Sequence, residues 1–255
     1  MNRYVLLIAA ATICIGFVVG AETRELSEIE KELGPRWDKI NTYTAKIEMK
    51  GEATQGPTKV KMEGKGTLEG MKKNEKMLYR LELDQTIHMG DTEMPNKMLV
   101  VATGDQMFTE TSMMGQTMVF KAKPDQQAQT VPGGGRESFK QLRANYDITV
   151  LPDETINDEP VYVLEMRPKE KVEQEPQSPA NSPKFEKSRL YISQKTGFPL
   201  KMLMFDEGET PIMSLKYKDY TIDPKLDPAR FEYTPPPGAM VMDADMFQQQ
   251  SQTTP

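Results

Sequence analysis

The feature that most constrains the fold of this chain is a two-residue alternation of apolar and polar side chains that recurs from Thr42 onwards. The alternation is longest between Met77 and Met89, where apolar residues alternate with charged or polar ones. Successive side chains of a β-strand project to opposite faces, so this pattern predicts strands with one apolar and one solvated face. The chain is therefore expected to be mainly β.

Eleven strands of this kind are predicted, and turns rich in Gly, Asn or Asp separate several of them. They lie at 42–50, 60–68, 77–89, 98–103, 107–111, 116–121, 146–151, 161–167, 187–193, 200–205 and 212–220. The first six follow one another at short intervals, which indicates an antiparallel meander. Because twist prevents a sheet of this size from staying flat, we expect it to curl.

Two short helices accompany the strands. The first is expected to begin at Ser27, because Ser27 and Glu30 have the spacing of a capping box, and the Gly-Pro pair at 34–35 is expected to interrupt it. The second helix is predicted at 137–146, where apolar residues recur at helical spacing.

The segment 1–21 is expected to be a cleaved signal peptide. A basic residue precedes an apolar run, and the residues before Glu22 fit signal-peptidase cleavage. A membrane anchor is the alternative, but the run is at or below the ~17 to 25 apolar residues of a spanning helix. Cys14 follows Ile13 instead of the small residue of a lipid-attachment signal. We therefore expect a soluble periplasmic protein.

Residues 22–242 are predicted to form a single domain, since one β domain commonly spans about 200 to 250 residues. The segment 168–184 is rich in Pro, Glu, Gln and Ser, a composition that predicts a disordered loop inside this domain. The tail at 243–255 contains three consecutive glutamines and is also expected to be disordered.

Residue types that support catalysis or metal binding are scarce. Cys14 is the only cysteine and lies in the predicted signal peptide, so no thiol would remain for disulfides or metal ligation. His88 is the only histidine and falls in the polar register of its strand, where a solvated side chain is expected. A net charge of −6 argues against nucleic-acid binding. We expect a monomer with no enzymatic activity, cofactor, metal or nucleic-acid partner.

The apolar register of the strands and of the second helix supplies the candidate ligand-binding residues. They are Ile47, Met49, Val60, Met62, Tyr79, Leu81, Leu83, Met118, Phe120, Phe139, Leu142, Leu190, Met202, Met204 and Leu215. Periodicity leaves open whether this surface is a solid core or a cavity. The chain has 19 methionines, whose flexible side chains fill cores and also adapt to ligands of several shapes.

From Leu190 onwards, the chain resembles the outer-membrane lipoprotein carrier family, the LolA-like proteins. The residues that carry the resemblance are Thr196-Gly197-Phe198-Pro199 between two strands and a closing motif of Asp227, Phe231, Thr234-Pro235-Pro236 and Gly238. Segments 43–52 and 145–165 are also similar to the family. The resemblance therefore covers most of the chain after residue 21.

This resemblance implies an incomplete barrel of about eleven antiparallel strands, whose concave apolar face is covered by short helices. It also implies a periplasmic carrier, a chaperone in protein transport and outer-membrane biogenesis, which binds lipoprotein acyl chains or another lipid. An inner-membrane ABC transporter and an outer-membrane acceptor would be its partners. Where the family has an arginine that pins a helical lid, this chain has Lys73, the candidate lid contact. The alternative function is an envelope-stress regulatory or lipid-sensing protein on the same fold.

Overall fold

The structure is a computed structural model that describes residues 24–55, 58–74, 76–113, 115–123, 135–169 and 185–243. The predicted signal peptide, most of the predicted 168–184 loop and nearly all of the predicted tail lie outside the described residues. Pro168 belongs to a strand, and the Lys169 N–H donates to the Asn145 carbonyl at 2.9 Å. Asp243 is also part of a strand.

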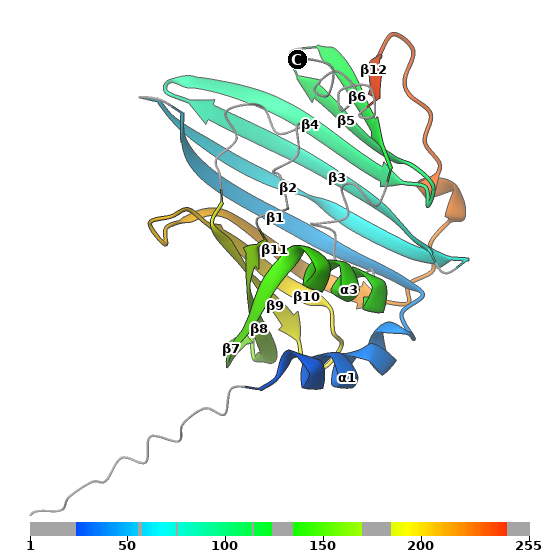
Figure 1. The fold of residues 1–255 in the computed structure, drawn as a ribbon. Coiled ribbons are helices and arrows are strands. Elements are labelled where there is room, and N and C mark those ends of the chain that lie inside the picture. The colour runs from blue at the N-terminus through cyan, green and yellow to red at the C-terminus, as the bar shows by residue number, and fades with distance from the viewer. Residues whose placement is uncertain are drawn as a thin grey trace, which may run out of the picture.

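Twelve strands of the described residues form one open sheet (Figure 1). They are β1 (Thr42–Gln55), β2 (Thr58–Lys73), β3 (Lys76–Met89), β4 (Thr92–Ala102), β5 (Met107–Met113), β6 (Gln116–Ala122), β7 (Tyr146–Ile156), β8 (Glu159–Pro168), β9 (Lys187–Ser193), β10 (Pro199–Phe205), β11 (Pro211–Ile222) and β12 (Met240–Asp243). Their order across the sheet is β12-β6-β5-β4-β3-β2-β1-β11-β10-β9-β8-β7. Two meanders, β1 to β6 and β7 to β11, thus meet where β1 pairs with β11.

The mainly β fold and the strands from β1 to β11 confirm the sequence-based prediction, including the open sheet expected of an incomplete barrel. All neighbouring pairs among these eleven strands are antiparallel. The twelfth strand was not predicted, and it pairs with β6 in the parallel direction. Its four residues are too few to display a clear alternation.

The two described helices of the α type are α1 (Leu26–Trp37) and α3 (Gly135–Asn145). Both lie at the β7–β11 end of the sheet, far from β12 (Figure 1). Their buried residues Ile29, Leu33 and Phe139 pack against a single face of β7, β8 and β9, which we call the helix face. The helices therefore cover one end of this face.

Two details of the predicted first helix were wrong. Glu25, not Ser27, is the N-cap of α1, and no described side chain caps it. The helix also continues through Pro35 to Trp37. A proline near the end of a helix removes only one backbone hydrogen bond, and the Asp38 N–H still donates to the Gly34 carbonyl at 3.0 Å.

The turn between β9 and β10 anchors the C-terminal end of α1. The indole N–H of Trp37 donates to the Gly197 carbonyl at 2.9 Å. Gly197 has a φ of 76°, and a Cβ on it would lie 2.4 Å from Trp37 Nε1. Glycine is therefore required here for its backbone conformation and for the close approach of the indole. This contact gives a structural reason for the glycine in the Thr-Gly-Phe-Pro sequence at the turn.

The closing motif forms an extended segment at residues 223–243, which we call the strap. It runs from the end of β11 to β12 (Figure 1) and includes the 3-10 helix η1 (Pro228–Phe231). The Asp227 carboxylate caps η1 by accepting from the Ala229 N–H at 3.0 Å, and Phe231 is buried. The Tyr233 ring packs on Phe108 with centroids 4.9 Å apart.

The strap covers the face of the sheet opposite to the helices, which we call the strap face. Arg230 donates to Glu69 at 2.6 Å, and the Tyr233 hydroxyl donates to Glu110 at 2.7 Å. Val101 and Val119 project to this same face by register and are fully buried. The strands β4 to β6 consequently bury apolar side chains on both faces. Among the described helices, none has the length and apolar character to cross a membrane.

Candidate functional site

The pairing register of the strands places a continuous apolar surface on the helix face. Residues directly opposite each other on paired strands project to the same side of a sheet. One row across seven strands comprises Tyr217, Ile47, Gly66, Leu83, Met98, Thr111 and Met118. The next row comprises Ala45, Leu68, Leu81, Val100, Thr109, Phe120 and Met242.

All of the ligand-binding candidates in the strands share this face. Val60 and Met62 join it through pairing with Met89 and Ile87. Leu215 lies opposite both Met49 and Met202, which links the two meanders. The remaining strand candidates are Ile47, Tyr79, Leu81, Leu83, Met118, Phe120, Leu190 and Met204, and the candidates Phe139 and Leu142 of α3 pack against the same face. Sequence alternation thus grouped these side chains correctly, while their role in binding stays a prediction.

Burial divides the helix face into a filled part and an open part. Ile47, Tyr79 and Leu83 are buried in the central core, which also contains Tyr43 and Tyr217. By contrast, apolar side chains towards β6 keep part of their surface exposed; these are Val60, Met62, Leu81, Ile87, Met94, Met98, Met118 and Phe120. The solid core therefore occupies one region of this face, and apolar side chains remain part exposed in the other.

Three buried tyrosines bring polar hydroxyl groups into the filled part, but none of these groups is charged. Burial raises the pKa of Tyr43, Tyr79 and Tyr217 above the ordinary value of a phenol. All three are therefore neutral at physiological pH. The Tyr79 hydroxyl donates to the thioether sulfur of Met107 at 2.6 Å, a partner that brings no charge onto the face.

Gln85 and Asn96 form a polar pair on the helix face that sequence reasoning missed. They are opposite each other on β3 and β4, and Asn96 Nδ2 donates to Gln85 Oε1 at 2.9 Å. The signal was present in the sequence, since Gln85 stands in the apolar register between Leu83 and Ile87. The prediction of this face considered only apolar residues and therefore did not include Gln85.

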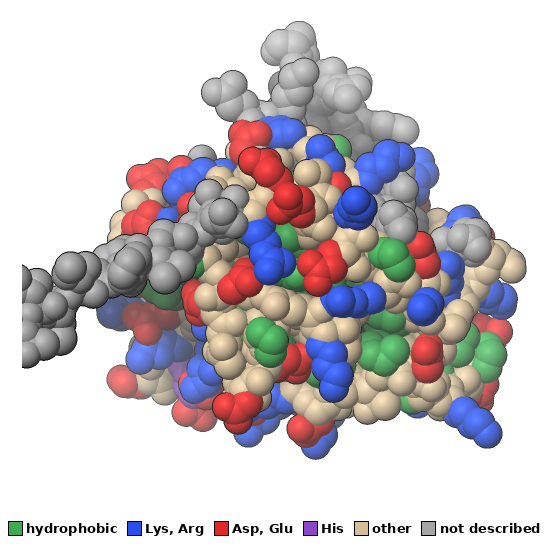
Figure 2. All heavy atoms as spheres, turned by 90° about the horizontal axis from the view of Figure 1, so that it is seen from below, with side chains coloured by type: hydrophobic (Ala, Val, Ile, Leu, Met, Phe, Trp, Pro, Cys, Tyr) green, Lys and Arg blue, Asp and Glu red, His purple; other side chains and the backbone are tan. Residues whose placement is uncertain are grey.

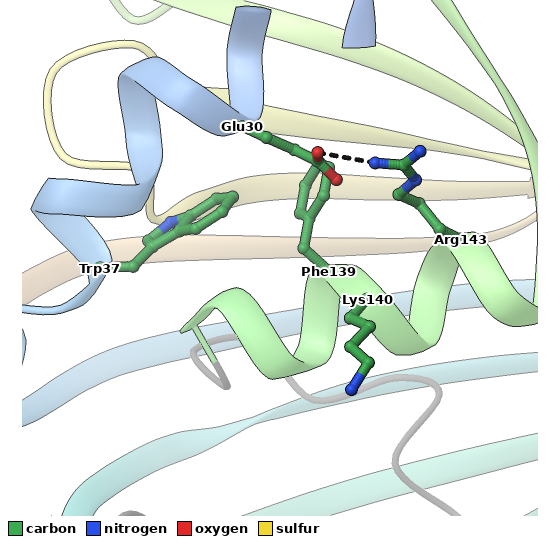
Figure 3. A pocket seen from close by; sticks show the side chains of 5 residues that line it. All are labelled: Glu30, Trp37, Phe139, Lys140 and Arg143. Carbon is green, nitrogen blue, oxygen red and sulfur yellow. Dashed lines mark hydrogen bonds and ion pairs between the residues drawn. The ribbon is translucent and has the colours of Figure 1, made fainter. Parts of the chain in front are cut away.

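A pocket of about 270 Å³ lies between the two helices. Figure 3 shows Glu30 and Trp37 of α1 pointing towards Phe139 and Arg143 of α3, with Lys140 pointing away. The rings of Trp37 and Phe139 are 5.0 Å apart, and Arg143 Nη1 is 2.8 Å from Glu30 Oε2. One aromatic contact and one ion pair therefore connect α3 to α1 around this pocket.

The role of Lys73 as a lid contact stays a prediction. Lys73 is exposed at the end of β2, where it pairs with Lys76 across the turn to β3. Among the side chains that the structure describes, none of the hydrogen bonds of α1 or α3 involves Lys73. Glu30 and Arg143 make the contact between helices instead.

Other polar residues of interest lie away from the helix face. His88 projects to the opposite side, and its Nδ1 is 3.3 Å from Glu93 Oε1 at 35% side-chain exposure, as expected of a solvated position. Within the described ranges, no group of three or more His, Cys, Asp or Glu side chains is arranged to hold a metal ion. Figure 2 shows acidic and basic side chains interspersed over the surface seen from below.

Comparisons with known proteins find a family model and several solved structures that are similar to this chain. A protein-family model described only as an uncharacterized protein matches residues 137–254. No curated protein matches the chain. An uncharacterized conserved protein from Thermus thermophilus is similar in structure, with 12% identity and a TM-score of 0.46 over 85% of this chain and 98% of that chain.

Two further solved structures are similar at the same distant level. MucB has 15% identity and a TM-score of 0.42, over 82% of this chain but only 62% of that chain. A putative outer membrane lipoprotein-sorting protein domain from Vibrio parahaemolyticus has 14% identity and a TM-score of 0.36, over 80% of this chain and 95% of that chain. The fold assignment rests on the strand order and pairing of this chain.

Proposed function

We propose that this chain is a periplasmic carrier that binds the acyl chains of lipoproteins, or another apolar ligand, on its helix face and transfers them towards the outer membrane. The observation that supports this proposal is the open part of that face. The helices pack on β7 to β9, whereas apolar side chains such as Met98, Met118 and Phe120 remain part exposed on the other meander.

The chemistry of the open part suits an acyl chain. Burying one methylene contributes about 0.8 kcal/mol, so enclosing a chain of ordinary length supplies ample binding energy. Several of the part-exposed residues are methionines, whose unbranched side chains adapt to ligands of different shapes. Such a surface binds by burial and requires no covalent chemistry, in agreement with the proposal that the chain is not an enzyme.

The cellular setting belongs to the same proposal. A cleaved signal peptide at 1–21 would deliver the protein to the periplasm. An inner-membrane ABC transporter would load it, and an outer-membrane acceptor would receive the cargo. These partners follow from the resemblance of the Thr196–Pro199 turn and the closing motif to the carrier family.

Binding of a fluorescent fatty-acyl probe to the purified protein tests the proposal. Met118 and Thr117 are neighbours on β6 that project to opposite faces, so they provide a matched pair. Met118→Glu would place a carboxylate against the acyl chain, and we expect at least a tenfold loss of probe affinity. Thr117→Glu adds the same charge on the strap face and should leave the affinity unchanged. Both variants should fold, because both positions are part exposed.

Two outcomes would contradict the carrier proposal. One is an equal effect of the two substitutions on probe binding. The other is protein purified from its native envelope without bound lipid, together with no affinity for the acyl probe. The second result would favour the regulatory or lipid-sensing alternative.

A further inference from the structure

The buried side-chain amides of Gln85 and Asn96 place polar groups on the otherwise apolar helix face. Gln85 is 7% exposed and Asn96 is 8% exposed. The register places apolar residues on both sides of the pair, with Leu83 opposite Met98 on one side and Ile87 opposite Met94 on the other. Two amides are therefore shielded from water within an otherwise apolar stretch of the sheet.

The hydrogen bonds of this pair leave one strong acceptor without a partner in the described part of the chain. Asn96 Nδ2 donates to Gln85 Oε1, while Gln85 Nε2 lies 3.9 Å from the thioether of Met49, a weak acceptor. Asn96 Oδ1 is buried and accepts no hydrogen bond from any described residue. Buried side-chain oxygens nearly always have a partner, because losing hydration without replacement is costly.

The surrounding residues hold the unpaired oxygen in place. Gly64 stands opposite Gln85 on β2, and a Cβ on Gly64 would lie 3.1 Å from Gln85 Cγ and 3.4 Å from Met49 Cε. Glycine at this position lets the Gln85 side chain lie close to the strand between Met49 and Asn96. The hydrogen bond from Asn96 Nδ2 to Gln85 Oε1 orients the Asn96 amide and leaves Oδ1 as the atom available to a ligand.

We propose that Asn96 Oδ1 accepts a hydrogen bond from the polar end of the bound ligand. The cargo is then an amphiphile whose acyl chain is joined to a neutral group with an N–H or O–H donor, such as an amide. Its chain lies on the part-exposed apolar rows that lead to Met118. This inference rests on the proposed function and specifies the class of ligand for the same face.

Two fluorescent probes with the same dye and the same dodecanoyl chain provide the test. One probe joins dye and chain through a secondary amide, and the other joins them through an ester, which has no donor. We expect the wild-type protein to bind the amide probe about tenfold more tightly, because only the amide satisfies the buried acceptor.

The variant Gln85→Met/Asn96→Leu replaces both amides by apolar side chains of similar shape. It should bind both probes equally and keep the wild-type affinity for the ester. Asn96→Leu alone is the second variant, should the double change fail to fold. Ser188→Ala is the matched control, since Ser188 Oγ is the other buried side-chain atom without a partner among the described residues and lies on β9. This control should keep the tenfold preference.

Equal binding of the two probes by the wild type would overturn the inference, since a water molecule or a purely structural role would serve both ligands alike. A preference that persists in the double variant would overturn it too. Failure of both probes to bind the wild type is a different result. It would contradict the proposed function and, with it, this inference.

Discussion

At the residue level, the glycines of β2 determine how closely large side chains pack on the helix face. Gly64, Gly66 and Gly70 all project to this face. A Cβ on Gly70 would lie 2.1 Å from the Cζ atom of Tyr43, whose ring is completely buried. The aromatic core therefore occupies space that a side chain on β2 would otherwise fill.

Gly70→Ala should lower the free energy of unfolding by about 1–3 kcal/mol or more, because the tyrosine ring has to move. Gly51→Ala is the control on β1, where the nearest atom to a new Cβ would be the Ile212 carbonyl oxygen at 3.5 Å. The control should be unchanged or up to about 1 kcal/mol more stable. Urea unfolding of both variants measures the difference. Equal free energies of unfolding for the two variants would show that the packing of Tyr43 does not require glycine at position 70.

At the level of elements, one aromatic contact and one ion pair join α3 to α1 among the described side chains. Phe139 is the only described side chain of α3 that is buried, and it meets Trp37 of α1. The ion pair between Arg143 and Glu30 is largely exposed, and such pairs contribute about 0–1 kcal/mol. Between α3 and α1, the aromatic contact is therefore expected to contribute more than the ion pair does.

Phe139→Ala should loosen α3 and expose the indole of Trp37 while the sheet stays intact. Trp37 is the only tryptophan, so a shift of the emission maximum to longer wavelength reports directly on this contact. Far-UV circular dichroism should retain the β signal. Lys140→Ala changes a side chain that lines the same pocket but points away from Trp37 and Phe139 in Figure 3, and it should leave the emission unchanged. An unaltered spectrum in Phe139→Ala would show that other contacts hold the helix.

At the level of the whole molecule, the strap covers the edge of β6 and places the short strand β12 at the end of the sheet. An unpaired edge strand exposes backbone donors and acceptors to other chains. β12 pairs with β6 at this edge, although Met240 is 63% exposed and Val241 is 49% exposed. β12 therefore protects this edge mainly through its backbone pairing with β6, and less through burial of its side chains.

Truncation after Ala239 should leave Phe231 and Tyr233 in place but uncover β6. We expect concentration-dependent self-association, which sedimentation velocity would detect. Truncation after Asp243 retains β12 and is the matched control, which should remain monomeric. If both truncated proteins sediment alike as monomers, β12 does not protect the edge.

Sequence patterns predicted the eleven strands and the composition of the helix face because alternation depends only on which residues point inwards. They did not predict the strap, since Pro235 to Pro237 have no period and β12 is only four residues long. Nor did they indicate that Gln85 and Asn96 would be buried together. The role of a polar residue in an apolar register can be assigned only when the residue opposite it on the neighbouring strand is known.

The junction of the two meanders has a consequence for the order in which the protein folds. Ile47 on β1 pairs with Tyr217 on β11, so this contact joins opposite ends of the chain. Pairing between distant segments is slow to form, whereas each meander folds through neighbouring strands. A chain that is synthesised from its N-terminus would leave one edge of β1 unpaired until β11 has been made. During that interval the exposed backbone groups of β1 are available for pairing with another chain.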